Sequence, residues 1–176
     1  MRCPKPAWLG SPARIDSRCT ARGTTTRTTT MTPRTAETDQ LSAALDDFYA
    51  AEAEYLAAGG PGRADFSGVA RHLDPDVVLH QDPGLPYSGT WRGHDGLERF
   101  FATMSRTWER FDIGEQDYWF GDATAVVLSR IRARARATGT ELEFPILQHI
   151  RIRDRGLAEV RPFYWDTAAI AKACSG

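Results

Sequence analysis

The amino-acid sequence predicts an α+β fold, in which helices come first and a mostly antiparallel sheet follows. Apolar residues recur every three or four positions in the first half of the chain, and strand-like segments separated by turn residues occupy the second half. One hairpin also sorts its charged and apolar side chains onto opposite faces. With 176 residues and 41% hydrophobic side chains, we expect a single domain with its own core.

Residues 1–38 differ in composition from the rest of the chain. They are rich in Thr and Arg, and residues 1–34 hold seven of the 22 Lys and Arg but only one of the 23 Asp and Glu. We expect a disordered extension, with Met31 as an alternative start and a transit peptide as a second interpretation. The folded domain is then expected over residues 39–173, with a short tail at 174–176.

Charge and cysteine usage exclude several classes of protein. Outside the extension the chain is mildly acidic and has no long basic face, which argues against nucleic acid as a partner. No apolar window is long enough for a membrane span or a secretory signal. Cys3, Cys19 and Cys174 lie near the termini, so neither a disulfide framework nor a thiolate metal site is predicted, a pattern typical of a cytoplasmic protein.

Three helices are predicted from the apolar periodicity. The first spans residues 41–56 and ends at a glycine-rich segment, and its stripe consists of Leu41, Ala44, Leu45, Phe48, Tyr49, Glu52, Tyr55 and Leu56. A short second helix is expected over 65–73, before the turn at 74–76. The third, within residues 94–111, has the stripe Leu97, Phe100, Phe101, Met104 and Trp108.

Strands are predicted at 77–80, 111–120, 124–137, 141–153 and 157–166, and residues 81–93 are expected to form a loop. Folding the hairpin about Gly139 opposes Arg136 to Glu141 and Ala133 to Phe144, so that charged and apolar pairs take opposite faces. The apolar face should carry the helices. The other face holds a ladder of four arginines, which we expect to face solvent. The alternatives are that the ladder binds an anion or contacts a partner subunit. The arginines are Arg130, Arg132, Arg134 and Arg136.

The order of these elements, with "GTWRGHDGL" after the first strand and the closing "RDRGLAEVRPFYWDTAAI", resembles the nuclear-transport-factor-2-like superfamily. Its small-molecule members include the SnoaL-like polyketide cyclases, ketosteroid isomerase and limonene epoxide hydrolase. The resemblance covers about residues 41–173. It implies a conical half-barrel, in which a strongly bent sheet wraps around three N-terminal helices and leaves an apolar pocket, with no metal or organic cofactor. It also implies a hydrophobic small-molecule ligand and a homodimer.

Two candidate proton carriers lie at the end of the first strand. Asp82, followed by Pro83, resembles the general base of ketosteroid isomerase, although counting without a gap places Gln81 there. The alternative is that Asp82 caps the turn. His80 could exchange a proton near neutral pH, and a structural histidine with a satisfied hydrogen bond is the alternative.

A third candidate is His149 in "PILQHIRIRD", which matches the pocket histidine of SnoaL-like cyclases. The strand register instead points Gln148 toward the helices, unless a bulge at Pro145 swaps the faces. Both possibilities stay open at the level of sequence. The acid/base Asp of those cyclases falls on Phe163, and the Arg-x-Asp element of limonene epoxide hydrolase falls on Arg130 and Arg132, which disfavours an epoxide hydrolase.

These residues predict a cofactor-independent enzyme that moves a proton on a hydrophobic carbonyl compound such as a polyketide, by cyclisation or isomerisation. The alternatives are a ligand-binding protein without catalysis and a dimeric interaction module of the same fold. Catalysis is assigned to His149, Asp82 and His80. Substrate binding is assigned to Tyr49, Tyr55, Trp91, Phe101, Trp119, Gln148, Arg161, Phe163 and Tyr164.

Overall fold

A computed structural model describes residues 36–154 and 156–175. The expectations about a disordered extension, the alternative start at Met31, and Cys3 and Cys19 lie outside the described residues. The first helix begins at Ala36.

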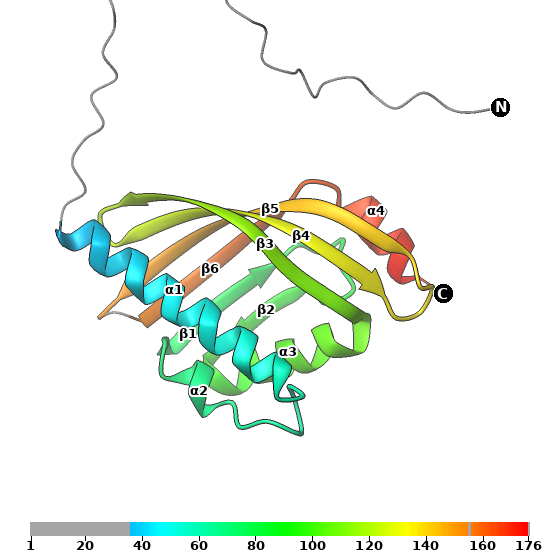
Figure 1. Ribbon diagram of the computed structural model, residues 1–176, viewed down its shortest axis with the longest axis horizontal. Coiled ribbons are helices and arrows are strands. Elements are labelled where there is room, and N and C mark those ends of the chain that lie inside the picture. The colour runs from blue at the N-terminus through cyan, green and yellow to red at the C-terminus, as the bar shows by residue number, and fades with distance from the viewer. Residues whose placement is uncertain (1–35, 155, 176) are drawn as a thin grey trace, which may run out of the picture. The chain divides into compact units, whose positions relative to one another are not determined.

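The described chain forms four helices and one six-stranded sheet (Figure 1). In chain order the elements are α1 (Ala36–Ala57), α2 (Ser67–Ala70), β1 (Leu73–Gln81), β2 (Gly89–Arg92), α3 (Gly93–Thr107), β3 (Trp108–Gly121), β4 (Thr124–Ala135), β5 (Glu141–Arg153), β6 (Gly156–Tyr164) and α4 (Thr167–Cys174). The strands lie in the order β2-β1-β6-β5-β4-β3, and the sheet is not closed. The β1–β6 pair is parallel and the other neighbours are antiparallel, which confirms the α+β class.

The prediction of three N-terminal helices is not confirmed, because in the described part of the chain α1 is the only long helix before the first strand. Helix α2 is a single turn of four residues, since Leu73 leaves the helix to pair with Leu157 of β6. Strand β2 and helix α4 were not expected. Residues 89–92 are too short and too rich in turn residues to read as a strand alone, and they become one by pairing with residues 78–81 of β1.

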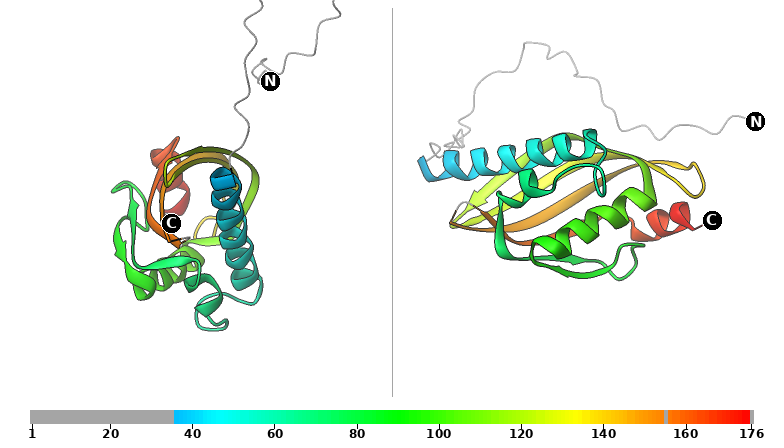
Figure 2. Two further views of the ribbon diagram at one scale, coloured as in Figure 1. Left: turned by 90° about the vertical axis from the view of Figure 1, so that its left-hand side faces the viewer. Right: turned by 90° about the horizontal axis from the view of Figure 1, so that it is seen from below.

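The sheet bends strongly, and helices α1 and α3 lie on its concave side (Figure 2). Alternation along the strands places one set of side chains against these helices and the other set on the convex side. The core lies between the sheet and the helices, and its most deeply buried residues include Leu45, Val69, Val77, Val127, Ile131 and Ile150.

The β4–β5 hairpin keeps the predicted faces but not the predicted register. Arg134 lies opposite Glu141, two residues from the expected pairing, because the turn closes with the Gly139 amide donating to the Ala135 carbonyl at 2.8 Å. A slip of two residues leaves every side chain on its original face. Pro145 pairs with Arg130 in an uninterrupted ladder, so the bulge considered at Pro145 is absent from this hairpin.

Candidate functional site

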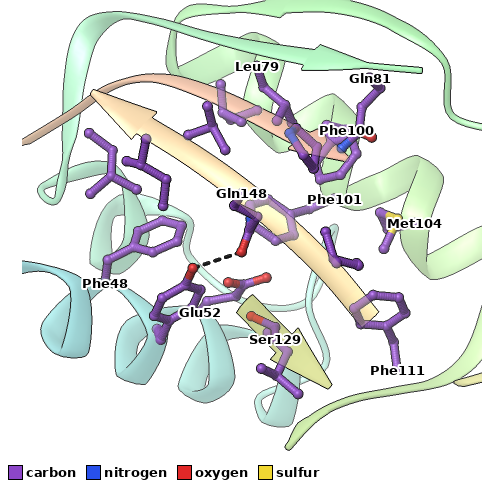
Figure 3. A pocket seen from close by; sticks show the side chains of 18 of the residues that line it. Phe48, Glu52, Leu79, Gln81, Phe100, Phe101, Met104, Phe111, Ser129 and Gln148 are labelled. Atoms are coloured by element: carbon purple, nitrogen blue, oxygen red, sulfur yellow. Dashed lines mark hydrogen bonds between the residues drawn. The ribbon is translucent and has the colours of Figure 1, made fainter. Parts of the chain in front are cut away.

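An apolar cavity lies between the concave face of the sheet and helices α1 and α3 (Figure 3). The space between its atoms, with the open mouth included, is about 790 Å³. Most of the wall is aliphatic or aromatic, and the polar side chains that line it are Tyr49, Glu52, Gln81, Ser129, Gln148 and Tyr164. A mostly apolar cavity with a few polar groups is the usual form of a small-molecule site.

Strand alternation brings the polar groups of the sheet into this cavity. Gln81 continues the inward series Val77 and Leu79 on β1, and Gln148 lies between the inward residues Ile146 and Ile150 of β5. Each amide therefore replaces an aliphatic side chain at a core-facing position.

Glu52 of α1 is the only charged residue that lines the cavity in the described part of the chain. Its carboxyl group projects from the helix toward the sheet (Figure 3). Burial raises the pKa of Glu52 from 4.5 to about 7, and no neighbouring positive charge or hydrogen bond in residues 36–154 and 156–175 offsets that effect. A carboxyl group with this pKa is present in both protonation states near neutral pH, which suits a general acid or base.

Tyr49 and Gln148 form a hydrogen-bonded pair beside Glu52. The Tyr49 hydroxyl donates to Gln148 Oε1 at 2.9 Å (Figure 3). Burial, together with the charge of Glu52, raises the pKa of Tyr49 far above its ordinary value, so the phenol stays protonated. Because the amide oxygen of Gln148 accepts this bond, its amide nitrogen is left with two N–H groups to offer.

The cavity continues into a groove between α1 and β3. Tyr49, Glu52, Phe111 and Ile113 line both the cavity and the groove. Glu52 therefore lies at the junction of the cavity and the groove.

A second polar region is formed by Gln81 and Tyr164. Gln81 is 8% exposed, and its Oε1 atom has no hydrogen-bond partner among the residues that the structure describes. Burial and the neighbouring Tyr87 hydroxyl raise the pKa of Tyr164 well above its ordinary value, so this phenol is also protonated.

Four of the predicted binding residues line the cavity, namely Tyr49, Phe101, Gln148 and Tyr164. The open choice between Gln148 and His149 is decided for Gln148, because the β4–β5 ladder runs without a bulge and places the two residues on opposite faces.

The predicted histidines do not lie in the cavity. His149 pairs with Arg161 on the convex face of the sheet, where His80 Nε2 lies 3.1 Å from Glu159 Oε1. Arg161 donates to the same carboxylate oxygen at 2.7 Å, and Arg151 lies 3.5 Å from the other oxygen. The hydrogen bond from Arg161 keeps the pKa of Glu159 below its ordinary value. These residues form a charge-compensated cluster on the convex face, outside the cavity lining.

Asp82 also lies outside the cavity. It is exposed, and its Oδ1 atom accepts a hydrogen bond from the Gly84 amide at 2.7 Å. This is the turn-capping role given above as the alternative to a general base. Strand β1 ends at Gln81, and the next side chain in the chain already belongs to the turn.

The remaining predicted binding residues fall outside the cavity lining for different reasons. Tyr55 is buried behind the wall, where its ring packs against Phe66 and Phe101. Trp91 packs on Phe100, and its indole N–H donates to the Tyr87 carbonyl at 3.2 Å. The others lie on the outer surface: Trp119, Arg161 and Phe163.

Glu52, Gln81 and Ser129 are site residues that sequence reasoning did not assign. The available signal was a polar residue at a position whose periodicity demands an apolar one. Glu52 interrupts the stripe of α1, Gln81 follows Val77 and Leu79, and Ser129 lies between Val127 and Ile131. Ser129 accepts a hydrogen bond from Gln116 Nε2 at 3.0 Å and is therefore satisfied.

No group of His, Cys, Asp and Glu side chains suited to a metal ion occurs among the described residues. Likewise, none of the helices in the described part combines the length and the apolar character needed to cross a bilayer.

An open, curved sheet around an apolar cavity with a few inward polar groups is a common architecture for sites that bind hydrophobic small molecules. The chain belongs to the SnoaL-like domain family, whose model matches residues 53–160. This confirms the resemblance predicted from the sequence. A comparison with curated proteins gives no match.

Several solved structures share this fold. A nuclear-transport-factor-2-like (NTF2-like) protein from Burkholderia xenovorans LB400 is similar at 20% identity and a TM-score of 0.67, over 78% of this chain and 97% of that chain. TerC, co-crystallised with polyporic acid, is similar at 18% identity and a TM-score of 0.66, over 78% and 99%. A protein from Jannaschia sp. CCS1, provisionally named a SnoaL-like polyketide cyclase, is similar at 15% identity and a TM-score of 0.61, over 78% and 93%. At these identities the likeness establishes the fold.

Proposed function

We propose that this protein is a cofactor-independent enzyme that moves a proton on a hydrophobic carbonyl compound, with Glu52 as the general base. The observation that carries the proposal is the carboxyl group of Glu52, which lies in an apolar cavity with a pKa of about 7. A carboxylate that is poorly solvated and ionised near neutral pH is suited to remove a proton from carbon.

In the proposed reaction, the Glu52 carboxylate removes a proton from the carbon next to the substrate carbonyl group. Negative charge then develops on the carbonyl oxygen, and the free amide N–H of Gln148 donates a hydrogen bond to it. The hydrogen bond from Tyr49 holds the amide of Gln148 in that orientation. Return of the proton to a different carbon gives an isomer, whereas attack of the enolate on a second carbonyl group gives a ring.

Three observations support a hydrophobic substrate. The wall of the cavity is mainly aliphatic and aromatic. TerC, a structural neighbour, was co-crystallised with polyporic acid, and the Jannaschia neighbour carries a polyketide cyclase name. A polyketide is therefore the substrate class that we propose.

Exchange of carbon-bound protons tests the proposal directly. We expect the protein to catalyse deuterium incorporation from D₂O into the α-carbons of 2-tetralone, a bicyclic ketone, as measured by proton NMR. Glu52→Gln should lower the catalysed rate by about 100-fold or more, since general-base catalysis contributes on that order. The matched control is Glu159→Gln on the convex face, which should keep the rate. Retention of the rate in Glu52→Gln contradicts the proposed base, and ligand binding without exchange by the unaltered protein favours a binding protein.

We also propose that the protein is a homodimer joined through the convex face of the sheet. Leu128, Leu147 and Phe163 form one row across β4, β5 and β6, and Phe163 is 59% exposed. The next two rows pair His149 with Arg161 and Arg151 with Glu159, and together they contain both signs of charge. An apolar row flanked by both charges can match a second copy of itself across a two-fold axis.

The dimer is tested by sedimentation velocity at micromolar concentration. Phe163→Lys should convert the dimer to a monomer, because it places a charge in the middle of the apolar row. Leu56→Lys is the matched control, since Leu56 is an exposed apolar residue on α1 rather than on the sheet. A monomeric unaltered protein, or a dimer unaffected by Phe163→Lys, contradicts this arrangement.

A further inference from the structure

The three glutamines whose side chains pack inside the curved sheet differ in whether the protein satisfies them. Gln148 accepts a hydrogen bond from Tyr49, and Gln116 donates to Ser129 and accepts from Tyr118 at 3.0 Å. Gln81 is only 8% exposed, yet its Oε1 atom has no hydrogen-bond partner within residues 36–154 and 156–175. A buried amide acceptor left unpaired in a native fold calls for an explanation.

The position of Gln81 supplies that explanation. Its side chain lines the cavity and continues the inward alternation of β1. In Figure 3 Gln81 lies beside Phe100 at one side of the cavity, whereas Glu52 and Gln148 lie together at the other. Gln81 and the Glu52–Gln148 pair therefore lie at different sides of the cavity.

The chemistry at this second region favours a neutral donor. An amide oxygen accepts hydrogen bonds, and no positively charged side chain among the described residues lines the cavity to hold an anion. A substrate hydroxyl or N–H group would satisfy the oxygen, whereas an ether or a second carbonyl oxygen would leave it unpaired and repel it.

We propose that Gln81 binds a hydrogen-bond donor of the substrate, at the end of the molecule remote from the carbon that Glu52 deprotonates. The preferred substrates are then hydroxylated or N–H-bearing hydrophobic carbonyl compounds, and a phenolic ketone is the simplest example. The assignment of the reacting carbon rests on the proposed function, but the binding role of Gln81 does not require catalysis.

A pair of matched ketones tests this inference. We expect the unaltered protein to bind 6-hydroxy-2-tetralone about tenfold more tightly than 6-methoxy-2-tetralone in calorimetric titrations, because the methoxy group cannot donate. Gln81→Leu should reduce the ratio of the two dissociation constants to about one. Gln116→Leu is the matched control and should keep the tenfold preference, since Gln116 does not line the cavity and its acceptor is already occupied by the Tyr118 hydroxyl.

Glu52→Gln identifies which end binds the hydroxyl group. The preference should persist in this variant, and its loss there would place the hydroxyl beside Glu52 and overturn the inference. Equal binding of the two ketones by the unaltered protein, or a preference that survives Gln81→Leu, also overturns it. Because the comparison of ketones on the unaltered protein needs no variant, the inference stays testable if Gln81→Leu fails to fold, and Gln81→Met then serves as a second variant of similar length.

The two proposals fail in different ways. A hydroxyl preference that depends on Gln81, without any deuterium exchange in 2-tetralone, supports this binding site and contradicts the proposed enzyme. Exchange that depends on Glu52, without a hydroxyl preference, supports the enzyme and overturns the role of Gln81.

Discussion

Carboxyl groups on the concave and convex faces of the sheet have pKa values that are shifted in opposite directions. Glu159 on the convex face contacts Arg161, His80 and Arg151, and the hydrogen bond from Arg161 lowers its pKa. Glu52 faces the concave side without such partners in the described chain, and burial raises its pKa to about 7. Among the described residues, neighbouring positive charges compensate the Glu159 carboxylate on the convex face, whereas none compensates the Glu52 carboxyl group on the concave face. A functional site is better indicated by an unpaired titratable group than by a cluster of paired ones.

The largest expected effect that sharpens this comparison is the pH dependence of stability. The folded protein holds the Glu52 proton at pH values where the unfolded chain has lost it. The contribution of Glu52 to the free energy of unfolding should therefore be highest below pH 4.5, fall by up to about 3 kcal/mol as the pH rises to about 7, and then level off. Urea unfolding at pH 5 and pH 8 measures this change. Glu52→Gln should remove most of the loss, and an unchanged pH dependence in that variant would show that Glu52 is not desolvated.

The pH dependence of catalysis should follow the same group. If Glu52 is the base, deuterium exchange should rise with pH to a plateau, with a midpoint near pH 7 and a rate at pH 5 about 100-fold below the plateau. NMR exchange rates between pH 5 and pH 9, corrected for buffer catalysis, provide the measurement. Glu159→Gln should leave the midpoint in place. A midpoint near 4.5 would mean that the acting carboxyl group is solvated.

Substitutions at two neighbouring positions on β5, one on each face of the sheet, should change the free energy of unfolding by smaller amounts. Gln148→Leu removes the acceptor of the Tyr49 hydroxyl and should lower the free energy of unfolding by about 1 kcal/mol. His149→Leu changes a convex position, and its effect should stay within about 0.5 kcal/mol. Urea unfolding at pH 7 measures both variants. A larger loss from His149→Leu than from Gln148→Leu would reverse the assignment of faces.

The smallest expected effect belongs to the convex cluster. Glu159→Gln should cost less than about 1 kcal/mol at pH 7, because partly exposed ion pairs contribute little. The lowered pKa of Glu159 means that its contribution is present above the ordinary pKa of a glutamate and is lost as the pH falls through the lower value in the folded protein. The difference between Glu159→Gln and the unaltered protein should accordingly vanish in strongly acidic urea titrations. A difference that grows on acidification contradicts the lowered pKa.

The sequence was sufficient to predict the fold class because periodicity is a local property. The stripe of α1 and the alternation of β4 and β5 follow from contacts within a few residues, and they set which side chains face the helices. Even the hairpin slip of two residues preserved the faces. Strand β2 was missed because it depends on pairing with β1, and the helix expected at 65–73 was cut short because Leu73 pairs with β6.

The candidate site followed local patterns only in part. Tyr49, Phe101, Gln148 and Tyr164 could be placed in the cavity from periodicity and resemblance, and Glu52 was visible as the one charged residue in an apolar stripe. The sequence alone could not rank these residues, because desolvation and pairing depend on what the rest of the chain brings nearby.

By itself the sequence determined an α+β fold, the inward and outward sets of its strands, and a family whose members enclose a cavity. Tertiary structure alone decided that Glu52 lies in the cavity without a compensating charge among the described residues, that His80 is paired with Glu159, and that Asp82 caps a turn. The physical reason is that side-chain direction follows from neighbours along the chain, whereas the charge state of a carboxyl group follows from neighbours in space.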